Sequence, residues 1–253
     1  MTDARAVRVE IAVESAEGVR IAAAAGATRV ELGSGLSVGG LTPGAGLIEA
    51  ALEGAADTQV HVLIRPRPGD FRYSEDEVAV MRRDIARARA LGAHGVVAGV
   101  LDAEGNVDRD ANAALIEAAD GMEVTFHRAF DVCTDPFAGF DRVRELGFTR
   151  LLTSGRQVSV LDGAGLIGQL VNLADGRIQV MACGGLRADN ARRVLELTGV
   201  RDLHAAVRLP VPGLPETESE VSFAEVGAPS GFDHFETDAA GVGALCETVR
   251  NCL

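Results

Sequence analysis

The chain has 253 residues, of which 47% are hydrophobic and 24% are charged, so it is long enough to bury a sizeable core. Asp and Glu outnumber Lys and Arg by 37 to 24, and the net charge of −13 disfavours nucleic acid and anionic membranes as partners. The start of the chain, MTDARAVRVEIAV, has no long apolar run and predicts neither a secretory signal nor a membrane span. We expect a cytoplasmic protein whose four cysteines, which show no CxxC spacing, are reduced thiols.

Eight segments predict buried strands, and the first is RVEIAV at residues 8–13. In chain order, the others are AAAAGATRVELGSG (22–35), AADTQVHVLI (55–64), ARALGAHGVVAG (88–99), AADGMEVTFH (118–127), VRELGFTRLLTSG (143–155), LADGRIQVMA (173–182) and LELTGVRDLHAA (195–206). In four of them the apolar run follows a glycine suited to the left-handed position that ends a helix: Gly26, Gly92, Gly147 and Gly199. The other three contain an aspartate that we expect to close a turn from helix to strand: Asp57, Asp120 and Asp175.

Amphipathic segments separate the strand candidates, as at residues 75–91 and 187–198. Strands that alternate with helices imply a parallel sheet with right-handed crossovers, and eight such units in about 250 residues fit a (β/α)8 TIM barrel, an α/β fold. We therefore predict a single TIM-barrel domain over residues 1–253. A doubly wound open sheet is the alternative, although no GxGxxG motif follows the first strand.

One segment interrupts this rhythm. Residues 206–236 are rich in Pro, Gly and Glu and fall between the eighth strand and a last helix predicted over 237–251. We interpret the segment as a long loop over the barrel mouth.

Two glutamates, Glu10 and Glu31, lie within or at the end of the first two predicted strands. A carboxylate among Val, Ile and Leu is costly unless a cation pairs with it, so we expect partners among Arg65, Arg67 and Arg128. Charged residues at the C-terminal ends of barrel strands converge on one mouth, where they usually serve function. The alternative is a structural ring of ion pairs that fills the barrel.

The segment IRPRPGDFRYS (64–74) follows the third strand and combines two prolines and a glycine with charged side chains. Its arginines, Arg65 and Arg67, carry planar donor groups that match a carboxylate or a phosphate. We expect this loop, including Asp70, to anchor an anionic substrate. A salt-bridged hinge is the alternative interpretation.

Two histidines occupy matching places near strand ends. His127 shares the face of Thr125 by the two-residue period of a strand, which points it into the lumen, and His204 lies on the eighth strand. A histidine there would act as a general acid or base or as a metal ligand, and Arg128 and Asp131 beside His127 favour a functional role. The alternative is a core histidine whose hydrogen bonds are satisfied.

Two glycine-containing turns are candidate anion cradles. Ser154 and Gly155 follow the sixth strand, and Gly184 and Gly185 follow the seventh and precede a helix whose first N–H groups could face an anion. No glycine follows the eighth strand, so half of the usual phosphate cradle of such barrels is missing. Tight turns are the alternative.

Cysteines at the mouth raise the question of a metal. Cys133 and Cys183 follow strands five and seven, and together with Met181 their soft sulfur atoms would suit Cu(I). Small buried cysteines are also common fillers of a core, which is the alternative.

The motifs VELGSGLSVGGLTPGAG, IRPRPGDFRYS, GVLDAEGNVD, VTFHRAFD, RLLTSGR and MACGGLRADN, in order over residues 8–206, resemble the successive signatures of the CutC family. The resemblance implies a cytoplasmic, usually homo-oligomeric (β/α)8 barrel with a role in copper homeostasis, and no reaction is firmly assigned to the family. The positions that match the family's mouth residues are Glu10, Glu31, Arg65, Asp70, His127, Arg128 and Ser154.

The chain departs from the family pattern at positions that bear on copper. Ala12 and Gly33 stand where many relatives carry cysteine, and Ala205 and Ala206 replace a serine-rich strand end. The chain therefore lacks the thiols that would be the most plausible Cu(I) ligands.

Three hypotheses follow. The first is a copper-binding or copper-handling protein, with copper as its metal ion. The second is an enzyme acting on a small anionic substrate, phosphorylated or sugar-like, in which Arg65 and Arg67 anchor the anion and Glu10 or Glu31 works with His127 in proton transfer. The third, a barrel that serves mainly as an assembly surface, leaves the charged mouth unexplained.

Overall fold

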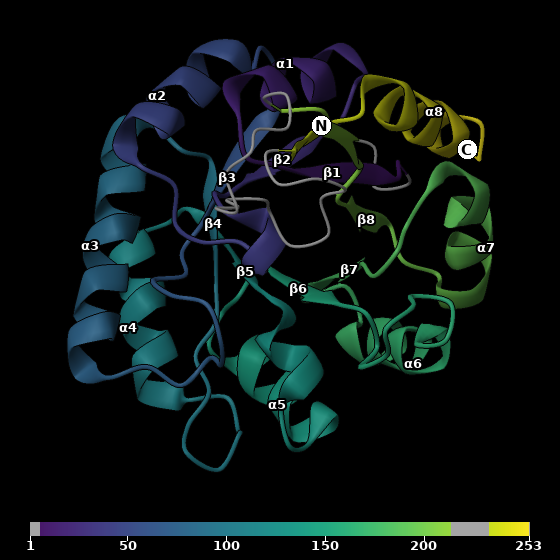
Figure 1. Cartoon of the computed structure of the whole chain (residues 1–253). Helices are drawn as coiled ribbons and strands as arrows, with labels where there is room; N and C mark the ends of the chain where they lie inside the picture. The colour runs from purple at the N-terminus through teal and green to yellow at the C-terminus, as the bar shows by residue number, and fades with distance from the viewer. Residues whose placement is uncertain (1–5, 214–232, 253) are drawn as a thin grey trace, which may run out of the picture.

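The computed structural model describes residues 6–213 and 233–252, in which eight parallel strands close into a barrel (Figure 1). Each predicted strand segment contains one of these strands, and the predicted TIM barrel is confirmed. The strands are β1 (Arg8–Val13), β2 (Arg29–Leu32), β3 (Gln59–Leu63), β4 (Gly95–Ala98), β5 (Glu123–Phe126), β6 (Arg150–Thr153), β7 (Gln179–Ala182) and β8 (Asp202–Ala205). Neighbours along the chain pair in sequence, and β8 pairs with β1 to close the ring.

A helix follows each strand, and the helices surround the barrel in chain order (Figure 1). They are α1 (Ala16–Ala24), α2 (Ala45–Gly54), α3 (Glu75–Leu91), α4 (Arg109–Ala119), α5 (Pro136–Glu145), α6 (Ala164–Ala174), α7 (Ala188–Thr198) and α8 (Ala239–Arg250), with short 3-10 helices η1 (Leu36–Val38) and η2 (Arg128–Val132). Within the described ranges, none of the helices has both the length and the apolar character that crossing a bilayer requires.

Local sequence explains where the helices begin and end. Ser74 and Glu77 form a capping box at the start of α3, and Gly92 ends it in the left-handed conformation. The predicted glycine turns are confirmed, since Gly26, Gly92, Gly147 and Gly199 all have positive φ. Of the three predicted aspartate turns, Asp120 and Asp175 adopt the left-handed conformation, whereas Ala56 takes that conformation in place of Asp57.

The predicted long loop contains regular structure at both ends. β9 (Arg208–Val211) and β10 (His234–Thr237) pair antiparallel as a two-stranded ribbon. The prediction of a loop over 206–236 is therefore wrong for these two strands. The high Pro and Gly content of the segment had indicated a loop throughout. The middle of the segment, 214–232, lies outside the described residues.

Charged side chains fill the N-terminal half of the barrel interior. Arg29 and Arg150, each 1% exposed, both contact Asp202, at 3.1 Å and 3.5 Å. Arg8 reaches the same carboxylate at 2.6 Å, and Arg150 also pairs with Glu123 at 2.9 Å. Because a buried charge is costly without partners, these pairs hold the strand starts together beneath the mouth.

Candidate functional site

A pocket of about 170 Å³ opens at the C-terminal ends of the barrel strands. It is lined by five of the predicted site residues: Glu31, Arg65, His127, Arg128 and His204. The other lining residues are Ala12, Leu36, Gly39, Leu63, Phe71, Leu152, Ala206 and Arg208. The closed ring thus brings residues from β1 to β9 to one pocket, as the TIM-barrel prediction implied.

Glu10 lies one layer below this pocket and is not among its lining residues. In the register of β1 and β2, Glu10 sits beside Arg29, and Ala12 sits beside Glu31. The Glu10 side chain is fully buried, Oε2 accepts a hydrogen bond from Nε of Arg29, and Oε1 bonds to Nδ1 of His204 at 2.7 Å. The partner is therefore Arg29, and the expected pairing of Glu10 with Arg65, Arg67 or Arg128 is wrong.

The surroundings of Glu10 keep it ionised. Burial raises the pKa of this carboxyl, but the charge of Arg29 and the hydrogen bond from His204 lower it further than burial raises it, and the net pKa is well below its usual range. An ionised Glu10 accepts the hydrogen bond, so Nδ1 of His204 carries a hydrogen. Glu10 consequently orients His204 and leaves Nε2 of the ring for a ligand.

Glu31 has a different environment although it is only one strand away. Its carboxyl is buried, and Oε2 has no hydrogen-bond partner among the described residues. Burial raises the pKa of Glu31 to about 7, with a further contribution from the charge of Glu10, while His204 and Arg29 act in the opposite direction. Near neutral pH this carboxyl therefore exists in both protonation states.

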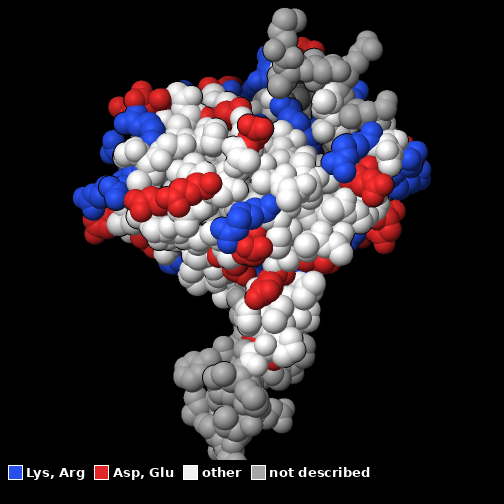
Figure 2. Space-filling view, turned by 90° about the horizontal axis from the view of Figure 1, so that it is seen from above, with Lys and Arg blue, Asp and Glu red and all other residues white. Residues whose placement is uncertain are grey.

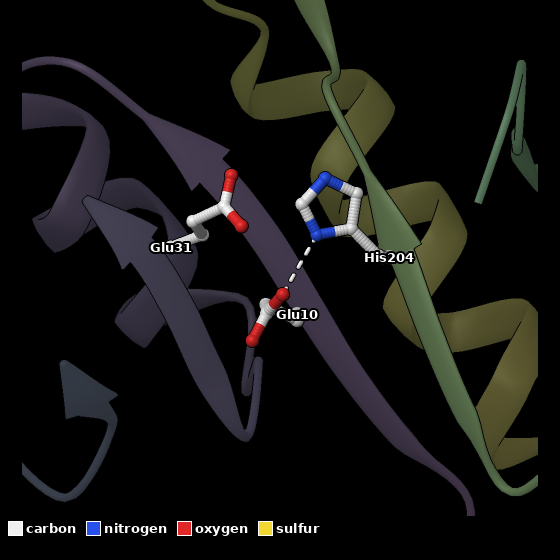
Figure 3. Close-up of side chains that lie close together, drawn as sticks. All are labelled: Glu10, Glu31 and His204. Carbon is white, nitrogen blue, oxygen red and sulfur yellow. Dashed lines mark hydrogen bonds and ion pairs between the residues drawn. The ribbon is translucent and has the colours of Figure 1, made fainter. Parts of the chain in front are cut away.

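His204 lies close to both glutamates, and both carboxyl groups turn toward its ring (Figure 3). Burial lowers the pKa of His204, but the charges of Glu31 and Glu10 and the bond from Glu10 outweigh it, and the pKa rises above its ordinary value. One donor atom from each of Glu10, Glu31 and His204 lies within 4.8 Å of the others, a spacing that could hold a cation. Both oxygens of Glu10 already accept a hydrogen bond, one from Arg29 and one from His204, so Glu10 is the least available of the three as a ligand.

Arg65 lines the pocket as a buried cation that pairs with no carboxylate in the part of the chain that the structure describes. Its Nη1 atom donates to the carbonyl oxygens of Val38 and Gly40 at 3.1 and 2.9 Å, and Nη2 donates to that of Gly69 at 2.8 Å. The guanidinium also lies 5.2 Å from the centre of the Phe71 ring, and Nε has no partner. Backbone carbonyls position Arg65 but leave its charge uncompensated.

Arg67 and Asp70, expected beside Arg65, do not line this pocket. The Arg67 guanidinium contacts the carboxylates of Glu77 at 2.6 Å and Asp70 at 3.0 Å, and stacks 5.0 Å over Tyr73. The side chain of Asp70 is 72% exposed. These residues close the loop onto the start of α3, which is the hinge-like alternative for this segment.

His127 lines the pocket as a neutral group. β5 ends at Phe126, and His127 caps the start of η2, where its Nδ1 accepts a hydrogen bond from the N–H of Ala129 at 3.3 Å. Burial and then the charge of Arg65 lower the pKa of His127 to about 3. The neutral ring therefore carries its hydrogen on Nε2, which is buried and has no partner among the described residues.

Arg128 reaches the pocket, and Asp131 holds it there. Nε of Arg128 donates to Asp131 at 2.8 Å, and Nη2 donates to Oγ of Ser154 at 3.0 Å. Asp131 also accepts from the hydroxyl of Thr153 at 2.5 Å and from the backbone N–H groups of Ser154 and Arg156. Asp131 and Ser154 thus fix the turn after β6 instead of lining the pocket.

The glycines proposed as anion cradles lie outside the pocket. Gly155 has a φ of +66°, and a Cβ placed on it would stand 2.2 Å from the carbonyl oxygen of Gly163. A Cβ on Gly184, where φ is +107°, would stand 2.9 Å from Cβ of Ser154. Gly155 and Gly184 are therefore required by close packing, while the carbonyl of Gly185 accepts from Asn190 in the first turn of α7.

A sequence model of the CutC family matches residues 7–209. The chain belongs to the CutC family. A CutC family protein of Glaesserella parasuis serovar 5 is 45% identical over 202 residues, which cover 80% of this chain and 83% of the relative. The relative from Parabacteroides distasonis is 42% identical over 237 residues, which cover 93% of this chain and 98% of that one.

Solved structures agree with this assignment. The crystal structure of a proposed copper homeostasis protein CutC from Streptococcus agalactiae has a TM-score of 0.74 and 34% identity, covering 78% of this chain and 97% of that chain. Thiamine phosphate pyrophosphorylase from Pyrococcus furiosus has a TM-score of 0.57 at 17% identity, covering 98% and 97% of the two chains, and shows the fold alone.

The cysteines of this CutC family member lie in separate environments. Cys183 packs with Leu152 and Met181 in a small apolar cluster, and burial raises the pKa of its thiol well above the usual value. Cys133 belongs to the main core, and its Sγ atom lies 3.5 Å from the carbonyl oxygen of Asp135. Neither cysteine lines the pocket, so the structure does not join them into a thiolate site for Cu(I) there.

Sequence reasoning missed two groups of residues. Arg29, Arg150 and Asp202 form the buried charge cluster below the mouth, and Arg208 lines the pocket from β9. The two-residue spacing of Arg29 from Glu31 and of Asp202 from His204 was the available signal, because side chains two apart share a strand face.

Proposed function

We propose that the pocket binds a small anionic molecule and that Glu31 and His204 exchange protons with it. The observation that carries this proposal is the environment of Arg65, a 5% exposed guanidinium that lines the pocket and, among the described residues, donates hydrogen bonds to carbonyl oxygens and pairs with no carboxylate. A buried charge without a counter-charge is unfavourable, and an anionic ligand would supply that counter-charge. A buried cation in a pocket beside a perturbed carboxyl is also typical of a functional site.

Glu31 supports the proton-transfer part of the proposal. A group whose pKa is about 7 gives up or takes a proton near neutral pH at little cost, which suits a general base or acid. His204, with a raised pKa, would be the complementary proton donor. In such a step the Glu31 carboxylate accepts a proton from the substrate, and Nε2 of the His204 imidazolium returns one to it.

His127 takes a different part from the acid–base role expected for it. Because its pKa is about 3, it does not carry a proton to give up at neutral pH. Its Nε2–H group would instead donate a hydrogen bond to a ligand oxygen. Glu10 would act through His204 and not on the substrate, since both of its oxygens are occupied.

Copper is the second candidate, and it rests on the similarity to the CutC protein of Streptococcus agalactiae, for which a role in copper homeostasis is proposed. The metal-binding groups that line the pocket are a carboxylate and imidazoles, whereas Cu(I) prefers thiolates and thioethers. Titration of Cu(I) against a competing chelator separates the two candidates. Tighter binding by wild type than by a Cys133→Ser, Cys183→Ser double variant would favour copper.

Calorimetric titration with propionate, a simple carboxylate, tests the preferred function. We expect wild type to bind propionate and Arg65→Met to lose at least about tenfold in affinity, because a charge-assisted contact is removed. Arg20→Gln, which alters an exposed arginine of α1, is the control for a loss of positive charge. Equal affinity in wild type and Arg65→Met would contradict the proposal.

The same titration in buffers of different ionisation enthalpy measures proton uptake. An anion bound near Glu31 raises the pKa of that carboxyl further, so wild type is expected to take up protons near pH 7. Glu31→Gln is expected to take up fewer. The cytoplasmic location, the homo-oligomeric state and the lack of nucleic-acid and membrane partners stay predictions.

A further inference from the structure

We infer that the pocket selects ligands with two negatively charged groups, one held by Arg65 and the other by Arg208. This inference rests on the proposed function and narrows its ligand class to small dianions. It assigns a specificity-determining role to Arg208, which lies at the start of the β9–β10 ribbon.

The order of strands in the ring places the two arginines on either side of Glu31. Arg65 follows β3 and Arg208 follows β8, and the pair β1–β2 lies between these strands in the closed barrel. Glu31 is on β2 and His204 is on β8. A ligand that reaches from Arg65 to Arg208 therefore crosses the part of the mouth where Glu31 stands.

The Arg208 side chain is held by Glu14 and Phe235 and still lines the pocket. Its Nη1 atom donates to Oε1 of Glu14 at 3.2 Å, and its guanidinium lies 4.9 Å from the centre of the Phe235 ring. The other Glu14 oxygen accepts the N–H of Leu36 at 2.9 Å, so one carboxylate serves both the η1 turn and the ribbon. The side chain of Arg208 is 19% exposed and lines the pocket.

The third arginine of the pocket, Arg128, has a closer counter-charge than Arg65 and Arg208. Arg128 makes a direct 2.8 Å contact with the carboxylate of Asp131, which itself has 7% exposure. Within the described ranges Arg65 pairs with no carboxylate, and Arg208 makes one longer contact, at 3.2 Å, with Glu14. These two arginines thus have the greatest capacity for an anionic partner.

The charge of the pocket contrasts with that of the whole chain. The chain has a net charge of −13, and acidic and basic side chains are interspersed over the face in view in Figure 2. Three arginines nevertheless line one pocket of about 170 Å³. A small cavity with low-dielectric walls, here Leu36, Leu63, Phe71 and Leu152, concentrates a positive field that favours small anions.

Calorimetric titrations at pH 7 with succinate, which has two carboxylates, and propionate, which has one, test the inference. We expect wild type to bind succinate about tenfold more tightly than propionate. Arg208→Gln is expected to reduce this ratio to less than about threefold, because it weakens the binding of succinate, which Arg208 contacts, more than that of propionate, which Arg65 holds. The exposed control Arg20→Gln should keep the wild-type ratio.

A second variant changes the ratio in the other direction. Glu14→Gln removes the carboxylate that competes for Arg208, while its amide oxygen still accepts the N–H of Leu36. We expect the ratio of succinate to propionate affinity to rise about threefold. A purely structural role for Arg208 would instead change both affinities together.

The outcomes distinguish a failure of this inference from a failure of the proposed function on which it rests. If wild type binds propionate but shows no preference for succinate, the inference fails and the proposed function stands. An unchanged ratio in Arg208→Gln, or a lower ratio in Glu14→Gln, also overturns the inference. If wild type binds neither compound, both fail.

Discussion

His204 on β8 and Glu10 on β1 are joined by a 2.7 Å hydrogen bond across the seam that closes the barrel. The other oxygen of Glu10 accepts from Arg29 on β2, so one carboxylate links three neighbouring strands. The contact that completes the fold therefore also orients a histidine at the mouth. Stability and the proposed chemistry share this residue.

Glu10→Gln tests that link. Removing the carboxylate takes away both the charge and the ionised acceptor that raise the pKa of His204, so the midpoint of its titration should fall. The titration is followed by NMR of ¹⁵N-labelled histidine, in which wild type should show a midpoint above 6.5. Glu17→Gln, on the exposed face of α1, should leave the midpoint unchanged. The same midpoint in wild type and Glu10→Gln would show that Glu10 does not control His204.

The barrel itself was predictable because local signals and chain order agreed. Glycines such as Gly92 end helices at regular intervals, and each is followed by a short apolar run that can only be a buried strand. Eight such units leave few topologies once the crossovers are right-handed. The ribbon of β9 and β10 was not predictable in this way, because its pairing joins segments more than twenty residues apart.

The sequence predicted some of the residues that line the pocket. Glu31, Arg65, His127, Arg128 and His204 were placed at the mouth correctly, but the partner of Glu10 was not. Arg29 is the first residue of its strand, a position that resembles a solvent-exposed strand end until the ring closes around it. Whether an arginine such as Arg67 turns inward or toward Glu77 depends on loop packing, which residue type and spacing do not determine.

Glu31 should make the stability of the protein fall as pH rises. Its pKa of about 7 in the folded state is above the ordinary value of 4.5, so the folded state binds the proton more tightly than the unfolded state. This contribution to stability is complete below pH 4.5 and is lost as pH rises through 7, and the difference in pKa corresponds to about 3 kcal/mol. Glu31→Gln should therefore be more stable than wild type at pH 8 and similar to it at pH 4.5.

Urea unfolding at these two pH values measures the effect. The exposed Glu17→Gln variant should track wild type at both, which controls for the general effect of net charge. A constant difference in unfolding free energy between wild type and Glu31→Gln across this range would mean that Glu31 has an ordinary pKa.

Asp202→Asn should destabilise the barrel strongly. Asp202 contacts Arg8, Arg29 and Arg150, and its removal leaves buried guanidinium groups with less counter-charge. Breaking a buried pair in this way costs about 3–5 kcal/mol. Urea unfolding should show this loss, whereas Asp175→Asn, at an exposed left-handed position where asparagine is tolerated, should stay within about 0.5 kcal/mol of wild type. A small effect at position 202 would show that the cluster is compensated in another way.

His127 should remain neutral well below pH 6.5, the ordinary pKa of histidine. Burial is the larger cause of its lowered pKa of about 3, and the charge of Arg65 is the second. Arg65→Met should therefore raise the midpoint of His127 but leave it below 6.5, because burial persists. Labelled ¹⁵N spectra should also show hydrogen on Nε2, since Nδ1 accepts from Ala129. A His127 midpoint at or above 6.5 would mean that the imidazole takes protons freely and could serve as the general acid itself.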